Sequence, residues 1–117
     1  MRYFYILSIT SLFLFSCTKE DVKPTTTDNT IKTSGYNFEP SLLTCNLGDT
    51  IYFELGSTHN AIEVNEVNYN SNSSSPLLDG FQFGFGESGF FVANEYKTYY
   101  YVCSPHLPQM KARIVVE

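Results

Sequence analysis

"YYYVCSPHLPQMKARIVV", residues 99–116, places a short loop between two strand-like runs. The tyrosines and valines of these runs favour strands, because aromatic and branched side chains fit a pleated, half-buried surface. The loop carries a thiol, an imidazole and a thioether, from Cys103, His106 and Met110. The stretch therefore predicts two β-strands with three potential metal ligands in the loop between them.

The rest of residues 35–117 repeats this pattern of short apolar or alternating segments separated by turn residues. Gly, Pro, Asn and Asp dominate the intervals, and no segment keeps a helical period. The chain has 117 residues, 43% of them hydrophobic, which suits a single packed core. We expect an all-β fold, a Greek-key sandwich or barrel of seven to eight strands. The expected strands are residues 36–38, 42–47, 50–55, 61–67, 81–85, 89–93, 98–103 and 113–116.

Residues 1–16 predict a signal peptide outside this domain. Arg2 precedes an apolar run, residues 3–15, that is shorter than the ~20 residues needed by a membrane-spanning helix. The run ends in LFSC at 14–17, which resembles the lipobox of bacterial lipoproteins and implies a lipid on Cys17. Thr18 resembles the next residue of lipoproteins passed on to an outer membrane. We expect an exported chain, lipid-anchored at the outer membrane and facing the periplasm or cell surface; ordinary cleavage with an incidental Cys17 is the alternative.

Residues 17–34 predict the lipidated cysteine followed by a flexible linker. The segment is rich in Thr, Asp and Lys and poor in apolar side chains, so it lacks the buried surface that would offset the entropy of ordering. A flexible chain of about 17 residues spans roughly 20–25 Å. We expect this linker to hold the domain clear of the bilayer surface.

The cysteines allow two interpretations. If Cys17 takes a lipid, Cys45 and Cys103 remain, and two cysteines in an oxidising compartment favour a disulfide. An immunoglobulin-type sandwich holds such a disulfide, but it packs a tryptophan on the bridge and this chain has none. Cys45 also alternates with Leu43 and Leu47, which favours a small buried side chain. In the other interpretation, Cys103 is a thiolate metal ligand.

Copper is the metal that fits the second interpretation. Thiolate, thioether and imidazole groups together select copper, and two histidines, one cysteine and a weak axial methionine make the blue-copper set. The chain has only two histidines. His59 follows a Gly-Ser turn at the expected start of a strand, where it can project from one end of a sandwich and join His106. Gln109 is the alternative to Met110 as the axial group, because an amide oxygen also serves there.

These segments resemble the cupredoxins of the plastocyanin and pseudoazurin type over nearly the whole domain. YNFEPSLLTCNLGDTIYFEL at 36–55 is similar to the family's opening strands, and HNAIEV at 59–64 is similar to its first ligand loop. The stretch 99–116 is similar to its second ligand loop and last strand, although only three residues separate the second histidine from the methionine, where the family usually has four. The resemblance implies one copper per chain, held by His59, Cys103, His106 and Met110.

The resemblance also assigns a bracing role to Asn60. Its side chain is expected to bond toward Ser104, and its backbone N–H toward the Cys103 sulfur. These contacts would join the two ligand loops.

The implied function is the transfer of single electrons between periplasmic or membrane redox partners. No substrate bond is made or broken in such a protein, so we expect no enzymatic activity. A copper-binding module for storage, delivery or sensing is the alternative, and a metal-free disulfide sandwich acting in adhesion is a third interpretation. From residue 35 to residue 117, three basic residues stand against nine acidic ones. This balance argues against nucleic-acid binding and favours a basic docking face on a redox protein such as a c-type cytochrome. We expect a monomer that contacts the membrane only through its lipid anchor.

Overall fold

The computed structural model describes residues 29–117, which form nine strands, one short α-helix and one 3₁₀ turn. The predicted signal peptide, Cys17 and the predicted linker up to residue 28 lie outside the described residues. The elements are β1 (Thr30–Ser34), β2 (Asn37–Glu39), β3 (Leu42–Cys45), β4 (Thr50–Glu54), β5 (Ala61–Val64), α1 (Glu66–Asn70), β6 (Gln82–Phe83), β7 (Ser88–Val92), β8 (Thr98–Val102), η1 (Ser104–His106) and β9 (Lys111–Val116).

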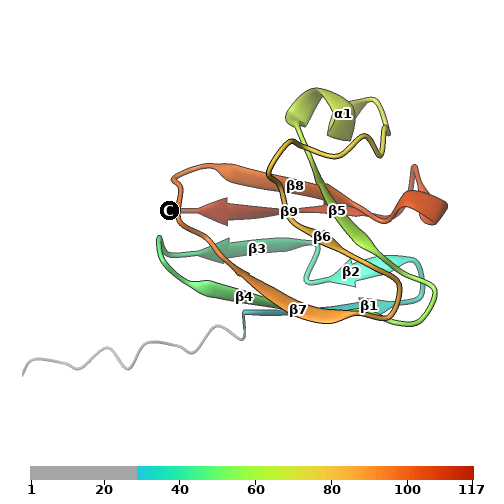
Figure 1. The fold of residues 1–117 in the computed structure, drawn as a ribbon, viewed down its shortest axis with the longest axis horizontal. Coiled ribbons are helices and arrows are strands. Elements are labelled where there is room, and N and C mark those ends of the chain that lie inside the picture. Colours follow the sequence, from blue (N-terminus) through green and yellow to red (C-terminus); the bar gives the residue numbers. More distant parts are fainter. Residues whose placement is uncertain (1–28) are drawn as a thin grey trace, which may run out of the picture.

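Two sheets face each other and form a β-sandwich (Figure 1). One sheet has the strand order β2-β1-β4-β7, and the other has the order β3-β9-β8-β5-β6. The pairs β1–β4 and β3–β9 are parallel, whereas the remaining pairs are antiparallel. The predicted all-β sandwich is confirmed, with nine strands in place of the seven to eight expected.

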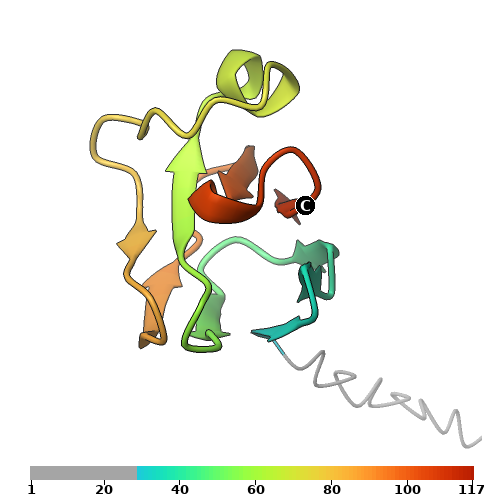
Figure 2. The same cartoon turned by 90° about the vertical axis from the view of Figure 1, so that its right-hand side faces the viewer.

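One end of the sandwich gathers three connections from distant parts of the chain. The turn between β1 and β2, the loop between β4 and β5, and the loop carrying η1 all lie at the right-hand end of Figure 1. Figure 2 looks at this end, with the η1 loop in red. The sandwich thus brings together segments that are more than 40 residues apart, as the Asn60–Ser104 separation of 44 residues illustrates.

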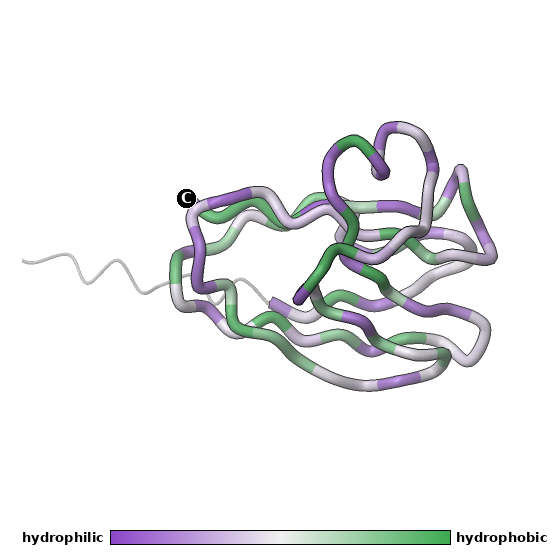
Figure 3. The backbone as a smooth tube through the Cα atoms, turned by 45° about the horizontal axis from the view of Figure 1, so that its top comes forward, coloured by the Kyte–Doolittle hydropathy of each residue, from purple (hydrophilic) through white to green (hydrophobic). Residues whose placement is uncertain are grey.

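The core between the sheets is built by alternating side chains. Strands β3 and β4 bury every second residue, as strands with one inward face do. Short hydrophobic and hydrophilic segments accordingly alternate along the chain in Figure 3. The Tyr101 ring packs edge-on against Phe38 and Phe53, with ring centroids 4.7 and 5.4 Å apart. This aromatic contact ties the two sheets together at the centre of the core.

Strand β1 occupies Thr30–Ser34, so the prediction that the linker extends to residue 34 is wrong at its end. Ile31 is fully buried, and β1 pairs with both β2 and β4. The segment looked like linker because its other residues are Thr, Lys and Ser. A strand needs only its backbone groups for pairing and a single inward apolar side chain for packing, so composition alone concealed it.

Helix α1 replaces the end of a strand that we expected over residues 61–67, and this prediction is also wrong beyond Val64. The Asn65 side chain accepts a hydrogen bond from the Asn68 backbone N–H at 2.8 Å and caps the helix. An N-cap of this kind accepts a hydrogen bond from one of the backbone N–H groups that the first turn of a helix leaves unpaired. Within residues 29–117, no helix is long and apolar enough to cross a membrane.

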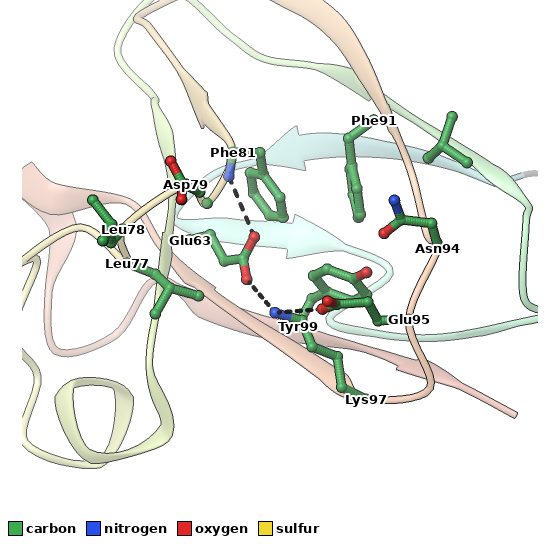
Figure 4. Close-up of a pocket in the computed structure, with 12 residues that line it drawn as sticks. Glu63, Leu77, Leu78, Asp79, Phe81, Phe91, Asn94, Glu95, Lys97 and Tyr99 are labelled. Atoms are coloured by element: carbon green, nitrogen blue, oxygen red, sulfur yellow. Dashed lines mark hydrogen bonds and ion pairs between the residues drawn. The ribbon is translucent and has the colours of Figure 1, made fainter.

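A buried ion pair lies between the sheets near the start of β8 (Figure 4). Glu63 of β5 is only 3% exposed. Its carboxylate accepts hydrogen bonds from Lys97 Nζ at 3.1 Å and from the Phe81 backbone N–H at 3.2 Å. Lys97 Nζ also lies 3.6 Å from the Glu95 carboxylate and 4.5 Å from the Tyr99 ring centroid. These residues line a cavity of about 470 Å³, in which the chain supplies its own cation to a buried carboxylate.

Candidate metal centre

Three donor atoms converge at the end of the sandwich where the loops meet. The Nδ1 atoms of His59 and His106 lie 3.1 Å apart. Cys103 Sγ lies 3.8 Å from the Nδ1 atom of His59 and 3.3 Å from that of His106. All three atoms lie within 4.8 Å of one another. Two imidazole nitrogens and one sulfur that face a common point are a set that a single metal ion can bind.

Two loops supply these atoms and hold them through backbone hydrogen bonds. In the β4–β5 loop, the His59 N–H donates to the Gly56 carbonyl at 3.0 Å. In the loop after β8, the His106 N–H donates to the Cys103 carbonyl at 3.2 Å, and the Met110 N–H donates to the His106 carbonyl at 3.0 Å. The Cys103 N–H donates to the Met110 carbonyl at 2.9 Å and closes this loop at its base. The second loop is therefore a compact, self-bonded turn.

Asn60 joins the two loops. Its side-chain amide donates to Ser104 Oγ at 2.9 Å, and its Oδ1 accepts from the Ser104 backbone N–H at 2.9 Å. Its backbone also acts to lower the pKa of the Cys103 thiol. The two contacts with Ser104 are those that the resemblance implied, and they fix the separation between the two ligand loops.

Burial sets the charge state of the donors. Cys103 is fully buried and His59 is 7% exposed. Burial raises the pKa of the Cys103 thiol, while hydrogen bonds from the Asn60 and His106 backbones oppose that rise. Burial and the neighbouring His106 lower the pKa of His59, and a hydrogen bond to the Gly35 backbone opposes the fall. His59 is thereby favoured in the neutral form that binds metals.

Comparison with known families gives the same answer as this geometry. Residues 25–117 match the family described as copper binding proteins, plastocyanin/azurin family. The chain belongs to this family. No curated protein was found to match it. The expected cupredoxin resemblance is confirmed.

Solved cupredoxin structures share the fold. A pseudoazurin from Hyphomicrobium denitrificans is 24% identical over 74% of this chain and 73% of its own, with a TM-score of 0.59. A reduced amicyanin mutant is 26% identical over 75% of this chain and 80% of its own, with a TM-score of 0.56. A purple cupredoxin from Nitrosopumilus maritimus is 18% identical over 75% of this chain and 98% of its own, with a TM-score of 0.56. These likenesses support the cupredoxin sandwich.

The donor set of this cupredoxin fits copper. A thiolate and two imidazoles suit both oxidation states of copper, and hard oxygen ligands are absent from the cluster of three described residues. Together with Met110 they make the arrangement typical of a type 1 copper site, with one copper per chain.

Met110 and Gln109 differ sharply in burial. Met110 is fully buried and belongs to the hydrophobic core, as does Cys103. Gln109 is exposed. A side chain that would complete the site with the buried thiolate has to lie inside the protein, so burial favours Met110 over the alternative Gln109.

Cys45 and Cys103 are both buried and both free thiols. The disulfide interpretation is therefore not supported by the structure. Cys45 ends β3 and packs in the core with an inward-facing side chain, as its alternation with Leu43 predicts. Cys103 is left available as a ligand.

Sequence reasoning missed the β1–β2 turn as part of this site. The Tyr36 ring packs on the His106 ring with centroids 4.7 Å apart and planes tilted by 48°. The Gly35 backbone acts to raise the pKa of His59, so the same turn also reaches the other histidine. The Gly-Tyr pair is a turn signal in the sequence, but nothing in the sequence reports which loop such a turn will touch.

Proposed function

We propose that this cupredoxin carries single electrons between redox proteins. The observation that supports the proposal is the convergence of His59 Nδ1, His106 Nδ1 and Cys103 Sγ beside the buried Met110. Bound copper supplies a one-electron couple between Cu(I) and Cu(II). We propose electron transfer without bond chemistry, because a site of this kind only gains and loses an electron.

The residues around the donors keep them in place in both oxidation states. Asn60 and Ser104 lock the two loops together through two hydrogen bonds of 2.9 Å. The backbone of the second loop is bonded to itself between Cys103 and Met110. Donors fixed in this way change position little when the charge of the site changes, and a small rearrangement lowers the barrier to electron transfer.

His106 provides the path between the site and the surface. Cys103, Met110 and His59 are buried, whereas His106 is only partly buried. Leu107 and Pro108 follow it on the same loop and add apolar surface beside the ring. We propose that a redox partner docks over this ring.

The partner and the location are also proposals. Nine acidic residues stand against four basic ones in residues 29–117, which supports a partner with a basic docking face such as a c-type cytochrome. Export and a lipid on Cys17 rest on the sequence of residues 1–17. We propose a lipid-anchored carrier at the outer membrane, facing the periplasm or the cell surface.

A copper titration of the purified protein, followed by visible absorption, tests the site. We expect an intense thiolate-to-copper band that saturates at one copper per chain. The band should be absent in Cys103→Ser and retained in Cys45→Ser, which removes the other buried thiol. A wild-type protein without the band would exclude a type 1 site.

Electron exchange with an oxidised, basic c-type cytochrome tests the carrier function. We expect fast reduction of the cytochrome by the copper(I) protein, with a rate that falls as ionic strength rises, because opposite charges steer the encounter. Slow exchange at every ionic strength, combined with rapid Cu(I) transfer to a thiol acceptor, would instead support copper storage or delivery. The short His106–Met110 loop is the feature that keeps this second function in view.

A further inference from the structure

The two-residue turn Gly35-Tyr36 joins β1 to β2 at the end of the sandwich that carries the candidate metal centre (Figure 2). Ser34 and Asn37 form the last pair of the hairpin, so the turn has the shortest common length. Gly35 has a φ of +58°, a conformation that glycine adopts without strain. A residue with a side chain at this first turn position would be strained, and the sequence places its aromatic residue at the second position.

Tyr36 is an exposed aromatic residue with one covered face. It is 55% exposed, yet its ring lies 4.7 Å from the His106 ring, centroid to centroid. Aromatic rings in such contact attract each other beyond the effect of area burial. The described contacts of this ring lead to a ligand and not to the core. Fold stability is therefore a weak explanation for a tyrosine at this position.

The same turn reaches both histidines. The Gly35 backbone lies close enough to the His59 ring to act on its pKa, while Tyr36 covers the His106 ring. The ring planes of the two histidines are tilted by 60°, with centroids 4.8 Å apart. Contacts that a ligand ring makes with groups other than the metal orient the ring and tune the bound metal. The turn belongs to the sheet of β1 and β2, whereas the ligand loops adjoin β5 and β8 of the opposite sheet.

We propose that Tyr36 is a positioning residue of the copper site, which orients the His106 ring and raises the reduction potential of the bound copper by excluding water from it. This inference deepens the proposed function and rests on it.

The sign of the effect follows from the charge of the site. One thiolate leaves a bound Cu(II) site with a net positive charge and a Cu(I) site neutral. Water stabilises the charged, oxidised form more than the neutral one, because desolvation penalises charge. A ring that covers the partly buried His106 removes water from that side. The covered site should thus be easier to reduce than the uncovered one.

Three variants separate this role from a structural one. Tyr36→Ala removes the ring, and Tyr36→Phe keeps the ring while removing its hydroxyl. Tyr96→Ala is the matched control, because Tyr96 is 73% exposed and lies next to Lys97, at the other end of β8. All three change an exposed tyrosine, so their thermal stabilities should be similar.

Two measurements decide the proposal. In the metal-free protein, NMR reports the His106 ring protons, which we expect to be shifted upfield by the Tyr36 ring in wild type and Tyr36→Phe and to lose that shift in Tyr36→Ala. In the copper protein, voltammetry should give a lower reduction potential for Tyr36→Ala than for wild type, Tyr36→Phe and Tyr96→Ala.

The outcomes distinguish this proposal from the proposed function. A copper site whose potential is the same in Tyr36→Ala and Tyr96→Ala, or His106 proton shifts that do not respond to Tyr36→Ala, would overturn the role of Tyr36 and leave the electron-carrier function standing. A wild-type protein that forms no type 1 site would overturn the proposed function itself, together with the claim about the potential.

Discussion

Each end of strand β8 carries a cluster of buried polar side chains, and the two clusters differ in what balances the buried groups. At its start, Lys97 reaches the buried carboxylate of Glu63 and forms a 3.1 Å ion pair. At its end, the buried Cys103 sulfur faces two histidine nitrogens at 3.8 and 3.3 Å. One cluster contains its own cation, and the other gathers only electron-pair donors.

This difference separates a structural cluster from a functional one. Glu63 has both carboxylate oxygens bonded, one to Lys97 and one to the Phe81 backbone. Buried charge that is fully paired needs no further partner. The Cys103, His59 and His106 donors instead converge on one point, and a metal cation completes such a set. Buried polar groups therefore indicate a binding site here only where the chain leaves them without a counter-charge of its own.

Copper should produce the largest change in stability. With free Cu(I) at about a thousand times its Kd, binding to the folded state alone adds about 4 kcal/mol to the free energy of unfolding. Anaerobic urea unfolding with and without Cu(I) measures this gain. Cys103→Ser should lose most of it, and Cys45→Ser should keep it. An equal gain in both variants would mean that copper binds elsewhere.

Removing the internal cation should cost less but still be clearly measurable. Lys97→Met leaves the Glu63 carboxylate buried without its ammonium partner, and we expect a loss of about 2–3 kcal/mol, below the usual range for buried pairs because Lys97 is partly exposed. The control is Lys32→Met, whose 3.6 Å pair with Glu54 has both side chains more than half exposed. The control should lose less than about 1 kcal/mol. Similar losses in both variants would remove the contrast between the two ends of β8.

The stabilising effect of Lys97 should disappear at high pH. Burial lowers the pKa of Lys97, but the hydrogen bond and charge of Glu63, with the charges of Glu95 and Tyr99, outweigh it and raise the pKa above the ordinary lysine value of 10.5. The stabilisation is therefore complete below pH 10.5 and is lost as the pH rises through the pKa of the folded state. Urea unfolding of wild type and Lys97→Met across this range should show a difference that is constant near neutrality and shrinks above pH 10.5. A difference that persists unchanged at higher pH would assign the effect to packing of the lysine methylenes.

The Tyr101 hydroxyl is a buried polar group that is paired neither with a cation of the chain nor with a metal site. Tyr101 lies within β8, is fully buried, and its hydroxyl has no hydrogen-bond partner among residues 29–117. Tyr101→Phe removes the unpaired hydroxyl and should raise the free energy of unfolding by about 1 kcal/mol. Tyr96→Phe, at an exposed position, should change it by less than about 0.5 kcal/mol. Thermal unfolding of both variants measures the difference, and a destabilised Tyr101→Phe would indicate that the hydroxyl is bonded after all.

Most of the fold was predictable because most of its strands show a clear pattern in the sequence. Alternation in β3, β4 and β9 follows directly from one buried face, and the turn residues between segments mark where strands end. Strand β1 escaped because only Ile31 faces the core. Helix α1 escaped because a single turn has no period to detect, and the Asn65 cap was its only signal.

The sequence by itself determined the chemistry of this protein. The residue types at His59, Cys103, His106 and Met110, and the spacing of the last three on one short loop, define a copper donor set through the intrinsic preferences of sulfur and imidazole. Only the tertiary structure decided which donors meet, that Met110 is buried and Gln109 exposed, that Tyr36 covers His106, and that Lys97 neutralises Glu63. Ligand chemistry is a property of single side chains and their local spacing, whereas burial and long-range contact depend on how the two sheets pack, which local sequence does not encode.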